Sequence, residues 1–218
     1  MSVNKEAYLH IINELKGKAT LVAVSKIKPV EDILALYELG QKDFGENYVQ
    51  ELVDKQAQLP TDIYWHFIGH LQSNKVKYIA PFVHLIHGVD SLKLLQEINK
   101  QAAKHNRTIQ CLLQVHIAQE TTKFGFSFEE LEALLIPKEL NNVEVVGLMG
   151  MASFSDDKQL VRNEFMQLKN QFEKLSSTHS SFKILSMGMS DDYSIALEEG
   201  SNMLRIGSLL FGKRIYTT

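Results

Sequence analysis

The stretch TLVAVSKIKPVEDILALYELG, residues 20–40, contains one complete strand-and-helix unit. Its first part is an apolar run that stops at a single cation, Lys26, which is typical of a buried strand with a polar end. Pro29 then opens a helix and Gly40 closes it, in the positions that these two residues favour at helix ends. The stretch therefore predicts a strand at residues 21–25 and a helix directly after it.

The same alternation of apolar runs and helix-period segments continues along the chain. The predicted strands cover residues 21–25, 43–46, 64–68, 85–89, 109–117, 144–149, 184–187 and 204–206. Strands that alternate with helices predict a parallel sheet covered by helices. Eight such units favour a closed (β/α)8 TIM barrel over an open doubly wound sheet, and no Gly-x-Gly-x-x-Gly follows the first strand. We predict an α/β fold with a single domain at residues 1–218 and an extra N-terminal helix at residues 3–15.

Five of the predicted helices begin at a residue that suits a helix N-cap. These residues are Ser73, Ser91, Ser127, Asp156 or Asp157, and Asp192. Ser127 and Glu130 also have the spacing of a capping box, in which each side chain accepts a hydrogen bond from the other residue's backbone N–H.

The composition is that of an ordinary globular chain, with 44% hydrophobic and 22% charged residues. A net charge of -3 gives no electrostatic footprint for nucleic acid. No apolar stretch approaches the roughly 20 residues of a membrane span, and the N-terminus lacks an apolar signal segment. The single cysteine, Cys111, lies in an apolar run and is expected to be a buried thiol, which suits a reducing compartment. We therefore expect a cytoplasmic protein.

The active face of a barrel of this kind lies at the carboxyl ends of its strands. Seven of the predicted strands end in polar or glycine-bearing segments, which are hard to explain as turns alone. These segments are Lys26 and residues 45–48, 66–75, 122–125, 147–151, 186–192 and 205–208.

Lys26 has two interpretations. A lysine amine at the end of a buried strand loses hydration, which lowers its pKa and frees it to attack a carbonyl and form an imine. The alternative is a strand-end lysine whose head extends to solvent.

The last two segments suggest a phosphate site, because barrels often bind phosphate through the loops after strands seven and eight. Gly207 and Ser208 open a short predicted helix whose backbone N–H groups would face outward, and Ser190 adds a hydroxyl from the neighbouring loop. The alternatives are a turn glycine and a plain helix N-cap. Taken together at the two expected loops, the three residues favour phosphate.

An amine that traps an aldehyde and a phosphate site on one face suggest pyridoxal 5'-phosphate (PLP). This cofactor also needs a partner for its ring nitrogen. Arg205 is placed for that role if its side chain points into the barrel, and the alternative is a surface arginine or a structural ion pair.

Six segments closely resemble the pyridoxal-phosphate homeostasis protein family. They are AVSK at 23–26, FGENYVQE at 44–51, WHFIGHLQSNK at 65–75, GLM at 147–149, SMGMSDD at 186–192 and RIGS at 205–208. This family comprises single-domain relatives of the alanine racemase barrel (fold type III), and the resemblance runs from about residue 21 to residue 212. It implies Lys26 as the imine lysine, Arg205 at the pyridine nitrogen, and Ser190, Gly207 and Ser208 around the phosphate.

Two further residues have open roles in the cofactor pocket. Asn47 resembles a family pocket residue or is a turn former at a strand end. Met149 packs beneath the cofactor ring or fills the core.

Several charged residues near these segments have plainer interpretations. We expect His66 and His70 to be packed or hydrogen-bonded, since no cysteine or carboxylate spacing supports zinc. Lys75 faces an anionic ligand or solvent, and Lys123 is a pocket lysine by resemblance or a solvated loop lysine. Asp191 and Asp192 are expected to be helix N-terminal charges rather than catalytic acids.

Two classes of function remain for such a site. The first is a non-catalytic carrier that stores, delivers or buffers PLP, with apo PLP-dependent enzymes as partners. The second is an amino-acid racemase or related enzyme, and a third, aldolase-like barrel fits Arg205 less well. Racemisation needs two bases, and in the racemase-like barrels the second is a tyrosine from an additional domain of the partner subunit. This chain ends at Thr218, directly after the eighth unit, so we expect a PLP carrier that is a monomer and not an enzyme.

Overall fold

The structure is a computed structural model that describes residues 3–120, 124–134 and 140–212. Eight parallel strands form a closed barrel in sequence order, and β1 pairs with β8 to complete it. The strands are β1 Thr20–Val24, β2 Asp43–Glu46, β3 Tyr64–Phe67, β4 Leu85–Val89, β5 Ile109–Val115, β6 Val143–Gly150, β7 Ile184–Ser186 and β8 Met203–Ile206. The predicted (β/α)8 TIM barrel is confirmed.

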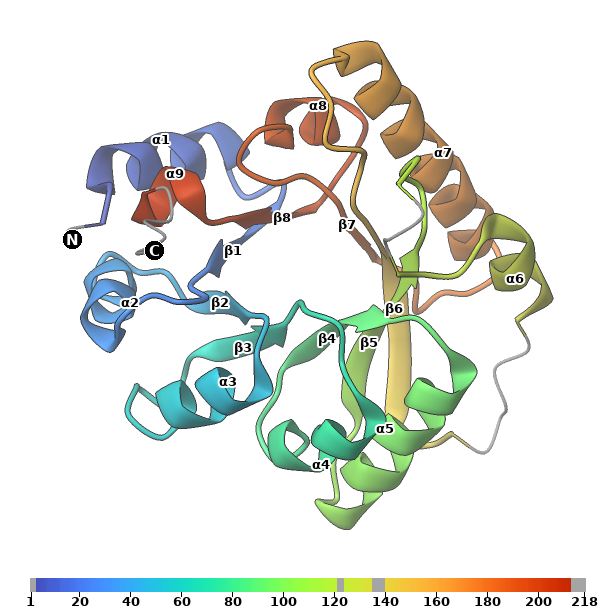
Figure 1. Ribbon diagram of the computed structural model, residues 1–218, viewed down its shortest axis with the longest axis horizontal. Coiled ribbons are helices and arrows are strands. Elements are labelled where there is room, and N and C mark those ends of the chain that lie inside the picture. The colour runs from blue at the N-terminus through green and yellow to red at the C-terminus, as the bar shows by residue number, and fades with distance from the viewer. Residues whose placement is uncertain (1–2, 121–123, 135–139, 213–218) are drawn as a thin grey trace.

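Helices surround the barrel on its outer side, as Figure 1 shows. They are α1 Lys5–Leu15, α2 Val30–Tyr37, α3 Val49–Gln56, α4 Val76–Ile79, α5 Leu92–Lys104, α6 Phe128–Ala133, α7 Lys158–Ser176, α8 Tyr193–Glu198 and α9 Ser208–Phe211. A short 3-10 turn, η1 Ser73–Lys75, precedes α4. The extra N-terminal helix lies beside the C-terminal α9, where the backbone N–H of Asn4 donates to the carbonyl of Leu210 at 2.8 Å. No helix in the described ranges is long and apolar enough to cross a membrane.

Most of the predicted caps are present. Ser91 accepts from the N–H of Leu94, Ser127 forms the capping box with Glu130, and Asp157 caps α7. The prediction for Ser73 is wrong, because Ser73 lies inside the 3-10 turn and cannot cap the helix that follows. Asp192 is the N-cap residue of α8 as predicted, but its carboxylate accepts from the N–H of Met189 at 2.6 Å and not from the helix.

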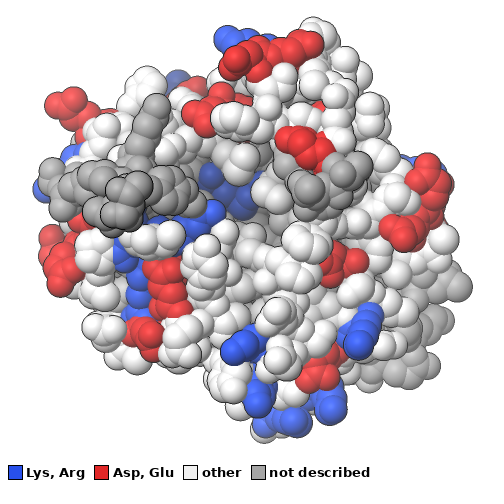
Figure 2. Space-filling model, in the orientation of Figure 1, with Lys and Arg blue, Asp and Glu red and all other residues white. Residues whose placement is uncertain are grey.

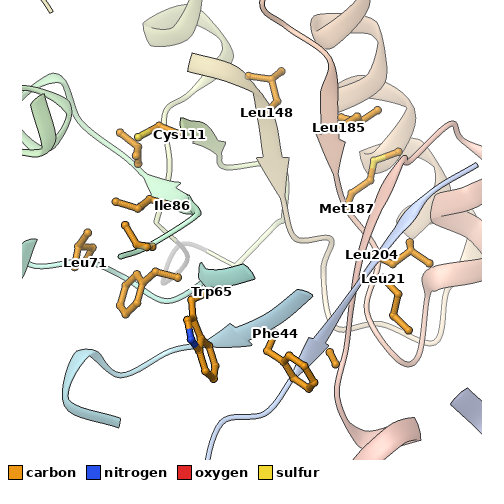
Figure 3. Close-up of a cluster of buried hydrophobic side chains, with 14 of the residues drawn as sticks. Leu21, Phe44, Trp65, Leu71, Ile86, Cys111, Leu148, Leu185, Met187 and Leu204 are labelled. Carbon is orange, nitrogen blue, oxygen red and sulfur yellow. The ribbon is translucent and has the colours of Figure 1, made fainter. Parts of the chain in front are cut away.

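The main core lies between the strands and the helices. Each of the eight strands contributes a buried side chain to it, and Figure 3 shows these side chains around the barrel. They are Leu21, Phe44, Trp65, Ile86, Cys111, Leu148, Leu185 and Leu204. Cys111 is fully buried as predicted, and burial raises the pKa of its thiol.

A smaller cluster fills the inside of the barrel. Its buried members are Val22, Leu85, Leu112, Val146, Met149 and Met203. Successive side chains of a regular strand point to opposite faces, so outside the irregular β6 a strand residue two positions from one of these members also points inward. That rule turns His87 and Arg205 into the barrel, two residues beyond Leu85 and Met203.

Gly147 permits the close contact between β6 and β7. A Cβ atom at this position would lie 1.8 Å from the carbonyl oxygen of Ile184, a distance that no side chain tolerates. The backbone there has φ +157°, and the register of β5 against β6 shifts between Cys111 and Leu112. The glycine therefore serves the packing of the barrel wall.

Candidate functional site

Lys26 lies two residues beyond the end of β1 and is half-buried. The residue before it, Ser25, is fully buried, whereas the residue after it, Ile27, is exposed. Ile27 has φ +60°, in the left-handed region that β-branched residues rarely adopt. A tight and strained turn therefore carries Lys26 at the carboxyl end of β1.

Arg205 points into the barrel, as the prediction required. Its side chain is almost completely buried, Nη1 donates to Ser186 Oγ at 2.6 Å, and Nη2 donates to the carbonyl of Gly150 at 2.9 Å. Burial lowers the pKa of the guanidinium to about 10, against the opposing effect of the Asp192 charge. A group with this pKa remains protonated at neutral pH, so the barrel holds a permanent cation.

A chain of hydrogen bonds runs from Arg205 through the barrel interior. Ser186 Oγ lies 3.3 Å from His87 Nδ1, His87 Nε2 lies 2.9 Å from His66 Nδ1, and His66 Nε2 lies 2.9 Å from Asp43 Oδ1. Arg205 only donates and the Asp43 carboxylate only accepts, so Ser186 Oγ accepts from Arg205 and Asp43 Oδ1 accepts from His66 Nε2. A neutral His87 ring can accept from Ser186 Oγ at Nδ1 and donate from Nε2 to His66 Nδ1.

The pKa of His87 agrees with this assignment. Complete burial, and then electrostatic interactions with His66, Arg205 and His84, hold this pKa well below the usual 6.5. The chain therefore connects Arg205 to Asp43 at the opposite end of the barrel through a neutral His87.

The loops after β7 and β8 are joined directly. Ser190 Oγ accepts a hydrogen bond from the backbone N–H of Gly207 at 3.3 Å, and the N–H of Arg205 donates to the carbonyl of Gly188 at 3.0 Å. Ser208 is exposed at the first position of α9, where N–H groups have no intrahelical acceptor. Ser190, Gly207 and Ser208 thus lie together, as the sequence predicted.

A cavity of about 840 Å³ opens beside Ser208. Met151, Ser153, Met189 and Asp192 also line it, whereas Lys26 and Arg205 do not. Figure 2 shows a hollow near the middle of the visible face, with Lys or Arg atoms inside it.

Asn47 carries a polar atom that lacks a partner. Its Oδ1 is buried and accepts no hydrogen bond from any described residue. A buried acceptor without a donor costs about 1–3 kcal/mol, so this atom fits a site that a ligand donor completes. Met149 is buried in the inner cluster, and the next residue, Gly150, is the one that binds Arg205.

The other residues that the sequence singled out lie as follows. His66 is part of the hydrogen-bonded chain. His70 lies 3.0 Å from Asp90 and stacks on Phe124 with ring centroids 4.1 Å apart, so both histidines are hydrogen-bonded as predicted. Lys75 is exposed, with its ammonium 5.7 Å from the Tyr78 ring. Lys123 lies outside the described residues, and within them no cluster of three potential metal ligands occurs.

Comparison with known proteins gives the family. The alanine racemase N-terminal domain family matches residues 3–215. The pyridoxal phosphate homeostasis protein of Aquifex aeolicus is 42% identical over 201 residues, which cover 91% of this chain and 88% of the relative. The chain belongs to the pyridoxal phosphate homeostasis protein family. The Synechocystis member is 38% identical and covers 95% of this chain and 97% of its own.

Solved structures agree with the barrel. PipY of Synechococcus elongatus, solved without PLP, is 34% identical with a TM-score of 0.89 over 95% of this chain and 99% of PipY. The same protein solved with PLP bound has a TM-score of 0.86 at 33% identity, over 95% and 99% of the two chains. An alanine racemase of Clostridium difficile is 16% identical with a TM-score of 0.74 over 99% of this chain and 58% of its own, which shows a shared fold.

Sequence reasoning missed several residues that support the site of this family member. His87 and Ser186 occupy inward positions of otherwise apolar strands. The alternation of inward and outward side chains along each strand could have identified these polar residues as inward-pointing. An ion cluster of Glu46, Glu51 and Lys55 was also missed, although Glu51 and Lys55 have the i,i+4 spacing of a helix pair.

Proposed function

We infer that this protein binds PLP at the carboxyl ends of its barrel strands and acts in PLP homeostasis. The observation that carries this inference is the PLP-bound structure of PipY, whose fold matches 95% of this chain. The residues described above fit the cofactor. A buried cation, an orphaned acceptor on Asn47 and two joined loops lie on the face where barrels bind their ligands.

We propose one role for each site residue. Lys26 supplies the amine that bonds to the cofactor aldehyde, and Arg205 donates to the ring nitrogen. Ser190, Gly207 and Ser208 bind the phosphate, while Asn47 and Met149 complete the pocket. The bound cofactor would supply an electron-accepting ring and an aldehyde carbon.

We further propose that the protein is a carrier rather than an enzyme. The names of its relatives describe homeostasis. A guanidinium has no acceptor and stays protonated, so Arg205 would keep the ring nitrogen unprotonated and weaken the ring as an electron sink. We propose one domain, a monomer, a reducing compartment, and apo PLP-dependent enzymes as recipients of the cofactor.

Amino-acid exchange in deuterated water tests the carrier proposal. Holo-protein is incubated with L-alanine and other L-amino acids, and deuterium at the α-carbon and chirality are followed over time. We expect slow or absent exchange, together with transfer of PLP to an apo-enzyme. Exchange near about 10 per second, the median of enzymes, would contradict a carrier.

A further inference from the structure

We propose that Glu51 and Lys55 are positioning residues for Lys26. They fasten the peptide groups on both sides of this lysine and so aim its amine into the site. The inference rests on the proposed function, in which Lys26 is the residue that bonds to the cofactor.

Both neighbours of Lys26 are bound to the same ion cluster. On one side the carbonyl of Ser25 accepts from Lys55 Nζ at 2.8 Å. On the other side the backbone N–H of Ile27 donates to Glu51 Oε1 at 2.6 Å. Glu51 and Lys55 are themselves joined at 2.6 Å, so a single cluster closes around one residue.

Lys55 has all three of its ammonium donors used. Besides the carbonyl of Ser25 and Glu51 Oε1, its Nζ donates to Glu46 Oε1 at 2.8 Å, and the same Glu46 oxygen accepts from Ser25 Oγ at 2.6 Å. The exposed fractions of the Lys55, Glu46 and Glu51 side chains are 7%, 0% and 22%. Buried ion pairs contribute little net stability because desolvation offsets their attraction. Net stability therefore does not explain this buried cluster, and its contacts with the turn around Lys26 do.

The backbone conformation of Ile27 shows what the cluster opposes. A left-handed β-branched residue is strained and persists only where its surroundings determine it. The Ile27 side chain is 59% exposed, so packing does not hold it there. Within the turn the N–H of Lys28 donates to the carbonyl of Ser25 at 3.0 Å, and the hydrogen bond to Glu51 holds Ile27 itself from outside.

Release of this turn would change the direction of the Lys26 side chain. In the covalent step the amine nitrogen replaces the aldehyde oxygen, which leaves as water with both amine hydrogens. The step depends on the orientation of the amine, and displacement by about 1 Å costs on the order of a hundredfold in rate. Binding of the phosphate end does not depend on this turn, so the two properties should separate.

Two pairs of variants of the full chain test the proposal. Glu51→Ala removes the acceptor for Ile27, whereas Glu51→Gln retains one. Lys55→Met removes the ammonium, whereas Lys55→Arg retains a buried donor. Lys174→Met, which breaks the exposed ion pair with Glu132, is the control for loss of an ion pair alone.

The measurements separate orientation from binding. The rate of covalent attachment is followed by borohydride trapping and intact-protein mass spectrometry, and non-covalent affinity is measured with pyridoxamine 5'-phosphate, which has no aldehyde. We expect Glu51→Ala and Lys55→Met to attach PLP roughly ten- to a hundredfold more slowly, with little change in affinity for the amine form. Glu51→Gln and Lys174→Met should stay near the wild type, and Lys55→Arg should lie between.

Two outcomes would overturn the proposal. One is attachment by Glu51→Ala at the wild-type rate. The other is an equal loss of attachment and of affinity for the amine form, which a merely structural role would produce. If Lys55→Met fails to fold, the Glu51 pair decides the question. Attachment of PLP to a lysine other than Lys26 in the wild type would overturn the proposed function as well. Attachment at Lys26 with wild-type rates in the Glu51 and Lys55 variants would overturn this inference alone.

Discussion

Arg205 Nη1 donates a hydrogen bond of 2.6 Å to Ser186 Oγ inside the barrel. Ser186 connects the cation of β8 to the neutral His87 of β4 and, through it, to His66 of β3. This contact and the one to the carbonyl of Gly150 fix the guanidinium inside the barrel. A rigid donor of this kind can bind an acceptor on a ligand without reorganising.

Replacement of Arg205 by lysine should destabilise the protein. Arg205→Lys retains the charge but cannot reach both Ser186 and the carbonyl of Gly150, so a buried acceptor loses its partner. We expect the free energy of unfolding in urea to fall by about 1–3 kcal/mol. Arg162→Lys is the control, because Arg162 pairs with Glu198 and Glu199 near the surface, where such pairs contribute about 0–1 kcal/mol. Equal losses for the two variants would contradict the buried network.

Stability should depend on pH through His87. Its folded pKa lies well below 6.5 because it is buried, so below about pH 6.5 the unfolded chain binds a proton that the folded chain does not. The contribution of His87 is therefore present above this pH and is lost as pH falls toward the folded pKa. Unfolding free energies of the wild type and of His87→Asn should converge by up to about 1.36 kcal/mol per pH unit. A constant difference would show that the pKa of His87 is the same in the folded and unfolded chains, which contradicts the buried neutral ring.

The phosphate site gives a third prediction. In the variant that combines Ser190→Ala with Ser208→Ala, each lost hydrogen bond to a charged group should cost about 1.5–3 kcal/mol of PLP binding. The affinity for PLP should fall well over tenfold, since about 1.4 kcal/mol corresponds to a factor of ten. Pyridoxal, which lacks the phosphate, is the control ligand and should bind the wild type and the double variant with equal affinity. A wild type that binds PLP and pyridoxal with the same affinity would rule out the site.

The strands were largely predictable because each is a short apolar run between polar residues. The prediction for β5 was too long, since His116 leaves the sheet to donate its N–H to Phe126 at 2.9 Å, a contact with the returning loop. The candidate site was only partly predictable. Lys26 and the glycine-bearing loops follow directly from strand ends, whereas the contact of Ser186 with His87 joins residues 99 positions apart.

Local sequence also gave no sign of the turn at Ile27. Isoleucine disfavours the left-handed region, so its conformation depends on the ion cluster and on the turn hydrogen bond from Lys28 to Ser25. That cluster depends on a helix and two strand ends meeting at one place, which a strand-by-strand interpretation does not include.

Borohydride reduction of the PLP-loaded protein, followed by peptide mass spectrometry, tests the central claim most directly. We expect the reduced pyridoxyl mass on the peptide that contains Lys26, and loss of that mass in Lys26→Ala. Because the phosphate contacts remain, the variant should keep some non-covalent affinity for the cofactor. Modification of a different lysine in the wild type, or an unchanged imine absorption band in Lys26→Ala, would contradict the account.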